Sequence, residues 1–213
     1  MILALENIDG VNPALPWRGD QLLQVLQALT ATAARLTPSP VSAPRAGANE
    51  GGGHWSKLAA DADRLGRLHQ IDAWAAANVT KLVELEEGCE AASRGDTLLH
   101  MDIRADNILL TDERVFFVDW PHAEVGAAWV DLVWFLPSVG MQGGPPPESL
   151  FWSHPLAAGV DRAGVLPVLA AVAAFMIDAA TQPPPPGLPS LRTFQLAQGR
   201  QAMAWLRQTI DSS

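Results

Sequence analysis

The sequence predicts a mostly helical α+β domain that carries one small β-hairpin near its middle. Apolar residues recur at three- and four-residue steps over most of the chain, which is the period of an amphipathic helix. Between residues 97 and 118 this period stops, and short apolar runs of strand type flank a polar turn. Hydrophobic residues make up 48% of the 213 residues, which is enough for a real core and excludes a wholly disordered chain.

Six helices are expected from the helical period. Asp20 is a suitable N-cap for the first of them, and Gly95 should end the third. The fourth is apolar nearly all round, which indicates a central, buried helix. The expected helices cover residues 20–36, 55–72, 79–92, 127–136, 163–180 and 191–210.

Strands and loops occupy the remaining segments. Short strands are expected at 97–100, 108–110 and 115–118, and Thr111–Arg114 is a polar turn that would join the last two into a hairpin. Three stretches rich in proline and glycine predict loops, of which the first is expected to be flexible. They cover residues 37–53, 140–147 and 182–189.

Composition excludes several classes of partner and location. The net charge of -9 argues against a nucleic-acid partner. Cys89 is the single cysteine, so no internal disulfide can form and a reducing compartment is expected. The longest apolar run, 163–177, contains Pro167 and falls short of the ~20 residues that a membrane span needs. With no export signal at its start, the protein is expected to be cytoplasmic, with no membrane partner.

Polar residues that could carry chemistry crowd around the hairpin. His100, Asp102 and Asn107 form the pattern H-x-D-x-x-x-x-N, and Asp119 follows at the far arm of the hairpin. The hairpin should bring Asp119 back beside Asn107, with Asp102 on the loop just before it. Carboxylate and amide oxygens suit a Mg²⁺ ion that shares its coordination with phosphates. Phosphoryl transfer also needs a carboxylate that accepts the proton of the attacking hydroxyl.

This segment resembles the catalytic loop of the protein-kinase-like superfamily, specifically the aminoglycoside phosphotransferase family and related small-molecule kinases. The resemblance extends through Val118-Asp119-Trp120 and over Gly126 to Leu132. It implies the C-terminal lobe of a protein-kinase-like fold, with ATP and Mg²⁺ as cofactors. It also implies that Asp102 is the catalytic base and that Arg104 faces the transferred phosphate.

The same resemblance assigns the other residues of the loop. Asn107 and Asp119 would be the Mg²⁺ ligands, and His100 would be a scaffold residue. Asp131 matches an aspartate that hydrogen-bonds the catalytic-loop backbone in family members. A carboxylate inside so apolar a segment would in any case need a partner, because burying it unpaired is costly.

The cysteine, a run of glutamates and the histidines outside this segment are mostly interpreted as structural residues. Cys89 falls on the apolar face of its helix and is expected to be an inert buried thiol. A run of glutamates is interpreted as a solvated helix face, with the border of an acidic substrate cleft as the alternative. Histidines without metal-ligand spacing are interpreted as surface or capping residues. The glutamates of the run are Glu84, Glu86, Glu87 and Glu90, and the histidines are His54, His69, His122 and His154.

The start of the sequence, MILALENIDG, is similar to the hinge that binds adenine in family members. The resemblance implies that Leu5, Glu6 and Asn7 contact the nucleotide, with residues 1–10 as a hinge-like segment and 11–213 as the C-terminal lobe. Family members place a Gly-rich loop and a strand lysine before the hinge, whereas Lys57 and Lys81 are the only lysines here and fall on expected helices. We therefore expect a truncated phosphotransferase that, on its own, binds ATP weakly and transfers phosphate poorly or not at all. An apolar patch near residues 1–5 would favour self-association or a missing N-terminal lobe.

The predicted function is transfer of the ATP γ-phosphate to a hydroxyl of a small molecule. A protein substrate is disfavoured, because about a dozen residues separate Asp119 from the next buried helix and leave no room for a long activation loop. Two alternatives stay open. The first is a non-catalytic remnant that binds a nucleotide or a partner, and the second is a helical interaction domain.

Overall fold

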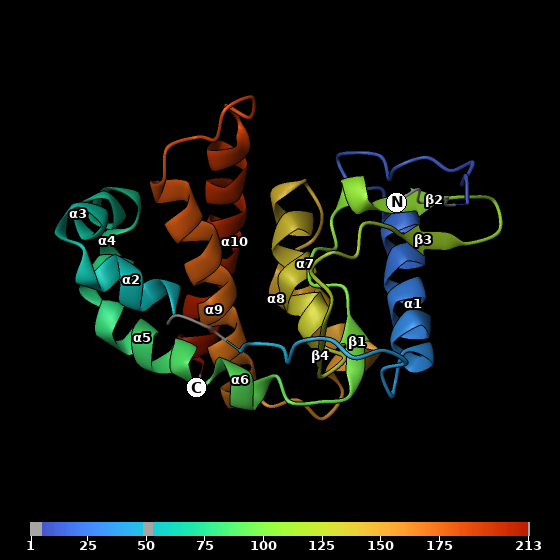
Figure 1. Ribbon diagram of the computed structural model, residues 1–213, viewed down its shortest axis with the longest axis horizontal. Coiled ribbons are helices and arrows are strands. Elements are labelled where there is room, and N and C mark those ends of the chain that lie inside the picture. The colour runs from blue at the N-terminus through green and yellow to red at the C-terminus, as the bar shows by residue number, and fades with distance from the viewer. Residues whose placement is uncertain (1–5, 49–52, 213) are drawn as a thin grey trace.

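Two long antiparallel helices form the centre of the protein in a computed structural model that describes residues 6–48 and 53–212 (Figure 1). They are α9 (Arg162–Thr181) and α10 (Leu191–Asp211), which pack against each other along their length. Helix α7 (Val130–Met141) packs against both and is buried on nearly all sides, as its composition predicts. Within the described residues, α9 is the one helix long and apolar enough to cross a membrane, and 61% of its apolar window is buried inside the protein.

Five short helices cover one side of α9 (Figure 1). The single helices expected over 55–72 and 79–92 are wrong, because the chain breaks at Asp61 and at Gly88. The Asp61 side chain accepts a hydrogen bond from the Arg64 N–H at 3.0 Å and so begins a new helix. The five helices are α2 (His54–Ala60), α3 (Ala62–Ile71), α4 (Ala73–Ala77), α5 (Val79–Glu87) and α6 (Cys89–Ala92).

The thiol of Cys89 is buried, as expected, and burial raises its pKa to about 11.

Helix α1 (Gly19–Arg35) lies on the opposite side of the protein, beside the hairpin (Figure 1). Its apolar face is buried as predicted, but Asp20 is not the N-cap. Arg18 occupies that position, and its guanidinium pairs with Asp20 at 2.9 Å. Helix α8 (Pro147–Ser153) was not expected, since its first residue was assigned to a loop. Proline suits the first turn of a helix because it has no N–H that would need a partner.

The strands form two antiparallel pairs, and the loop over residues 100–107 joins one pair to the other. Strand β2 (Ile108–Leu110) pairs with β3 (Val115–Phe117), with Ile108 opposite Phe117. The turn between them closes with a hydrogen bond from Thr111 N–H to the Arg114 carbonyl at 3.0 Å, so the predicted hairpin is confirmed. Strand β1 (Thr97–Leu99) pairs with β4 (Glu124–Gly126), a strand that the sequence analysis missed.

The proline-rich segment after α1 is held by backbone hydrogen bonds over part of its length. Ser39 N–H donates to the Asp96 carbonyl at 2.6 Å, and Val125 N–H donates to the Pro44 carbonyl at 2.7 Å. Residues 44–46 therefore lie along the free edge of β4. The flexibility expected for 37–53 stays a prediction, and residues 49–52 lie outside the described part.

Candidate active site

The loop between β1 and β2 is fixed at its start by a buried carboxylate. Asp131, near the start of α7, accepts hydrogen bonds from the backbone N–H of His100 at 2.9 Å and of Met101 at 2.8 Å. Burial raises the pKa of Asp131, and the two N–H donors act against this shift. The partner that the sequence predicted for Asp131 is thus the backbone of the loop between β1 and β2.

His100 joins this loop to the end of the hairpin. Its Nε2 lies 2.9 Å from the carbonyl of Val118, and its Nδ1 lies 3.2 Å from the backbone N–H of Asp102. A carbonyl can only accept and an N–H can only donate, so the ring carries its proton on Nε2. The ring also packs against Trp120, with ring centres 4.6 Å apart. His100 therefore has the scaffold geometry expected of it.

Asp102 and Asn107 lie in direct contact. The side-chain N–H₂ of Asn107 donates to the Asp102 carbonyl at 2.8 Å and to Asp102 Oδ2 at 3.1 Å. Asn107 is buried, whereas the Asp102 side chain keeps 27% of its surface exposed. Because the amide nitrogen of Asn107 makes both bonds, its amide oxygen is the atom suited to bind a hard cation.

Arg104 places a positive charge beside Asp102. One guanidinium nitrogen lies 3.5 Å from Asp102 Oδ1, and two others bind the Asp106 carboxylate at 3.1 Å each. This two-point pairing fixes the plane of the guanidinium. A cation held next to the expected base could stabilise charge on a phosphoryl group that passes between them.

Asp119 follows β3 in an unusual backbone conformation. Its φ of 67° lies in the left-handed region, which costs free energy for a residue other than glycine and concentrates at functional sites. The preceding Val118 N–H donates to the Asn107 carbonyl at 3.0 Å, so the hairpin does bring Asp119 back to the neighbourhood of Asn107. The side chain of Asp119 is exposed.

The expected metal ligands fit a shared magnesium site better than a self-contained one. Within residues 6–48 and 53–212, no group of three His, Cys, Asp or Glu side chains could hold a metal ion. One carboxylate from Asp119 and one amide oxygen from Asn107 leave most of the coordination sphere to water or phosphate oxygens. Mg²⁺ commonly binds in this way when it is delivered with a nucleotide.

The hinge-like segment is described only in part. Leu5 lies outside the described residues, while Glu6 and Asn7 are exposed and belong to no helix or strand. The chain then reaches the hairpin, where Val11 and Leu110 exchange backbone hydrogen bonds at 3.0 and 2.8 Å. The nucleotide contacts assigned to Leu5, Glu6 and Asn7 stay predictions.

Asn12 is a residue of the site that the sequence analysis missed. Its side-chain N–H₂ lies within 3.2 Å of two carbonyls of the short 3₁₀ helix η1 (Ala105–Asn107) and 2.8 Å from the carbonyl of Ile108. These hydrogen bonds hold the turn that contains Asn107 in position. No motif marks Asn12, because its partners lie more than ninety residues away in the sequence.

A cavity of about 560 Å³ opens beside the catalytic loop. Asp102 and Arg104 line it, and α7, α9 and α10 supply much of its apolar wall. Its volume suits a small organic molecule. The apolar wall includes several aromatic and sulfur-bearing side chains, among them Met101, Trp134, Phe175, Met176 and Phe194.

Glu86 also lines this cavity and is buried, which corrects the solvated position expected for it, whereas Glu84, Glu87 and Glu90 are exposed as expected. Glu86 is 3% exposed and accepts hydrogen bonds from the backbone N–H groups of His54 at 2.8 Å and Trp55 at 2.9 Å. Glu86 therefore caps the first turn of α2 from a different helix. Burial raises its pKa, and these two hydrogen bonds oppose the shift.

Replacing the exposed carboxylate is a direct test of the metal site. Asp119→Ala should remove Mg²⁺-dependent nucleotide binding, since a single amide oxygen is a poor anchor for Mg²⁺. Titration of the chain with ATP, with Mg²⁺ and with EDTA, should show a Mg²⁺-dependent difference in affinity that the variant loses. Asp112→Ala, in the exposed hairpin turn, is the matched control. Equal Mg²⁺ dependence in both variants would contradict the assignment.

The chain is similar to one protein family and to a solved structure. The model of the phosphotransferase enzyme family matches residues 2–175. A solved structure of choline kinase from Cryptosporidium parvum Iowa II is similar, with 15% sequence identity and a TM-score of 0.47. That match covers 97% of this chain and 71% of the other. No curated protein matches the sequence.

Proposed function

Because the chain belongs to the phosphotransferase enzyme family, we propose that it transfers the γ-phosphate of ATP to a hydroxyl group of a small molecule. The single observation that carries the proposal is the position of Asp102. Its carboxylate is held by Asn107 and flanked by Arg104, and both Asp102 and Arg104 line the cavity of about 560 Å³. An acceptor in that cavity would have its hydroxyl next to a carboxylate able to accept the proton.

In this proposal each charged group of the loop has a separate task. Asp102 accepts the hydroxyl proton as the oxygen attacks phosphorus, and Arg104 stabilises the charge on the phosphoryl oxygens. Asn107 and Asp119 would hold Mg²⁺, which neutralises the nucleotide phosphates when it is bound. His100 and Asp131 act on none of the reacting atoms and only fix the loop.

The acceptor proposed is small and cationic or neutral rather than a protein. The chain runs from Asp119 to the start of α7 at Val130 without a long intervening loop. The net charge of -9 favours a cationic acceptor such as an aminoglycoside. A cytoplasmic location, where ATP is available and Cys89 stays reduced, belongs to the same proposal.

The placement of the lysines supports a second candidate function. Lys57 lies on α2 and Lys81 on α5, so neither is the strand lysine that binds the α- and β-phosphates in kinases. A non-catalytic protein that binds a nucleotide or a partner without transferring phosphate is therefore the alternative.

An acceptor panel separates the two. The chain is incubated with ATP, Mg²⁺ and, in turn, kanamycin, choline, ethanolamine, glucose and a serine-containing peptide, and ³¹P NMR detects new phosphate esters. Transfer to at least one small hydroxyl compound, lost on adding EDTA, is the result that the proposed function requires. Mg²⁺-dependent ATP binding without any ester would favour the alternative, and phosphorylation of the peptide alone would contradict the proposed acceptor class.

A further inference from the structure

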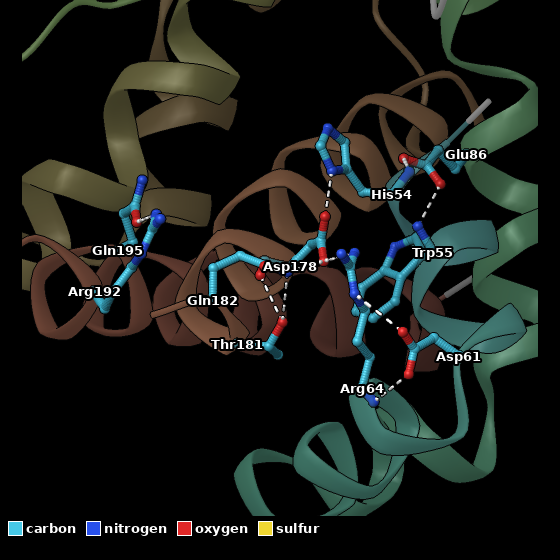
Figure 2. Close-up of polar contacts among 10 residues, drawn as sticks. All are labelled: His54, Trp55, Asp61, Arg64, Glu86, Asp178, Thr181, Gln182, Arg192 and Gln195. Atoms are coloured by element: carbon cyan, nitrogen blue, oxygen red, sulfur yellow. Dashed lines mark hydrogen bonds and ion pairs between the residues drawn. The ribbon is translucent and has the colours of Figure 1, made fainter. Parts of the chain in front are cut away.

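The wall of the cavity formed by α2 and α9 carries a chain of polar side chains that phosphoryl transfer does not use (Figure 2). His54, at the start of α2, lines the cavity, and its Nδ1 lies 2.9 Å from Asp178 Oδ2 on α9. The other carboxylate oxygen of Asp178 accepts a hydrogen bond from Arg64 at 3.1 Å. Arg64 is held in turn by Asp61, 3.6 Å away.

This chain of contacts fixes where the His54 proton lies. Burial alone would raise the pKa of Asp178, but the hydrogen bond from His54 and the charge of Arg64 hold the pKa below its usual value. Asp178 is therefore a carboxylate that can only accept, so His54 Nδ1 must donate to it. In the neutral ring this leaves a lone pair on Nε2.

The ring is also fixed in orientation. His54 N–H donates to Glu86 at 2.8 Å, and the imidazole packs edge-on against Phe175 with ring centres 5.4 Å apart. Phe175 packs in the same manner against Trp134, and both aromatic rings line the cavity. Figure 2 shows the second ring nitrogen of His54 on the side opposite to Asp178. The His54 side chain keeps 29% of its surface exposed, so an acceptor can reach it.

We propose that His54 determines acceptor specificity by accepting, at Nε2, a hydrogen bond from an N–H group on the part of the acceptor remote from the transferred phosphate. The inference rests on the proposed function and names a recognition residue for it. A primary ammonium is favoured over a hydroxyl by the charges that share this cavity. Its described lining includes three carboxylates, of Asp102, Glu86 and Glu124, against one guanidinium, that of Arg104.

One of these carboxylates, that of Glu124, has an oxygen without a hydrogen-bond partner among the described residues, which favours a ligand with several hydrogen-bond donors. Glu124 Oε2 is buried and has no hydrogen-bond partner among the described residues. The same holds for Oε1 of Gln198, which also lines the cavity and is 2% exposed. Buried acceptors of this kind are rare unless a ligand or water satisfies them.

The same ion pairs also tie α2 and α3 to α9, so the test must separate recognition from stability. Ethanolamine and choline are suitable probes, because they share a hydroxyl and differ only in the methyl groups that remove every N–H donor from nitrogen. Kanamycin is a larger amine that suits the cavity volume. Ligand-observed NMR titrations of the full chain give a Kd for each probe without any turnover.

The unaltered chain should bind ethanolamine several-fold more tightly than choline. His54→Phe should weaken ethanolamine and kanamycin binding about tenfold, the value of one well-placed hydrogen bond, and leave choline binding unchanged. His54→Gln, whose amide can reach the place of Nε2, should restore the affinity to within about threefold. His69→Gln, on the exposed face of α3, is the control and should change neither Kd.

Three outcomes would overturn the inference. They are equal affinity for ethanolamine and choline in the unaltered chain, no binding of either ethanolamine or kanamycin, and a His54→Phe chain that melts at a lower temperature but keeps every Kd. The KM for the acceptor could also be measured in a transfer reaction that depends on Asp102. An equal KM in the unaltered chain and in His54→Phe would overturn the inference about His54 while leaving the proposed function intact. Absence of transfer to all acceptors would defeat the proposed function, and the titrations would still decide the role of His54.

Discussion

Asp102→Asn should lower the rate of phosphate transfer by roughly 10²–10⁴-fold, because the amide cannot take the proton of the attacking hydroxyl. The replacement has nearly the same shape, and its amide oxygen can still accept the hydrogen bond that Asn107 gives to Asp102. The fold and the cavity should therefore persist. The affinity for Mg²⁺-ATP should stay within about threefold, since Asp102 is not one of the two expected metal ligands.

The measurement compares initial rates of ester formation, by ³¹P NMR or by coupled ADP detection, with the melting temperature of each variant. Asp112→Asn carries the same chemical change on the exposed hairpin turn and should keep the full rate. If Asp102→Asn retained the full rate while Asp119→Ala lost it, phosphate transfer would proceed without a carboxylate base. The role given to Asp102 would then be wrong.

The parts of the site that the sequence predicted depend on short stretches of chain. The hairpin has a turn of local polar residues between two apolar runs, and Ile108 does pair with Phe117. Asp131 was predicted to need a partner because a carboxylate in so apolar a helix has no other way to be satisfied. Its two N–H partners confirm that argument.

The parts that were missed depend on contacts between distant segments. Glu86 has the sequence context of a solvated helix face, yet α2 places two backbone N–H groups against it from thirty-two and thirty-one residues away. His54 and Asp178 are 124 residues apart. Helical periodicity predicts which face of one helix is apolar, but it does not predict which other helix will pack over a polar residue.

The helix breaks have a more local cause that could have been found. Asp61 and Asp72 both cap a following helix, with their side chains accepting from the N–H groups of Arg64 and Ala75. Aspartate is a favoured N-cap, but apolar residues continue at helical spacing across Asp61, and this spacing alone predicts one uninterrupted helix. Capping chemistry therefore decided the boundary where hydrophobic spacing did not.

Asp131→Ala should lower the free energy of unfolding by about 2–4 kcal/mol, because it leaves the buried N–H group of His100 and the partly buried N–H group of Met101 without an acceptor. The loss of a buried carboxylate, whose desolvation is itself costly, keeps the effect below the sum of two unsatisfied donors. Urea unfolding followed by tryptophan fluorescence measures the change. Hydrogen exchange at the His100 and Met101 amides should accelerate together.

Two further variants separate this specific contact from a general effect of removing charge. Asp131→Asn keeps one acceptor but points an N–H₂ group at the other backbone N–H, so it should also destabilise the protein although it changes no volume. Asp211→Ala, on the exposed last turn of α10, should change the free energy of unfolding by less than about 0.5 kcal/mol. Because Asp131 positions the expected base, Asp102, through the loop backbone, Asp131→Asn should also lower kcat under conditions where the chain is still folded. An Asp131→Ala chain as stable as the unaltered one, with His100 and Met101 amides still protected from exchange, would show that the loop is held in place by other contacts.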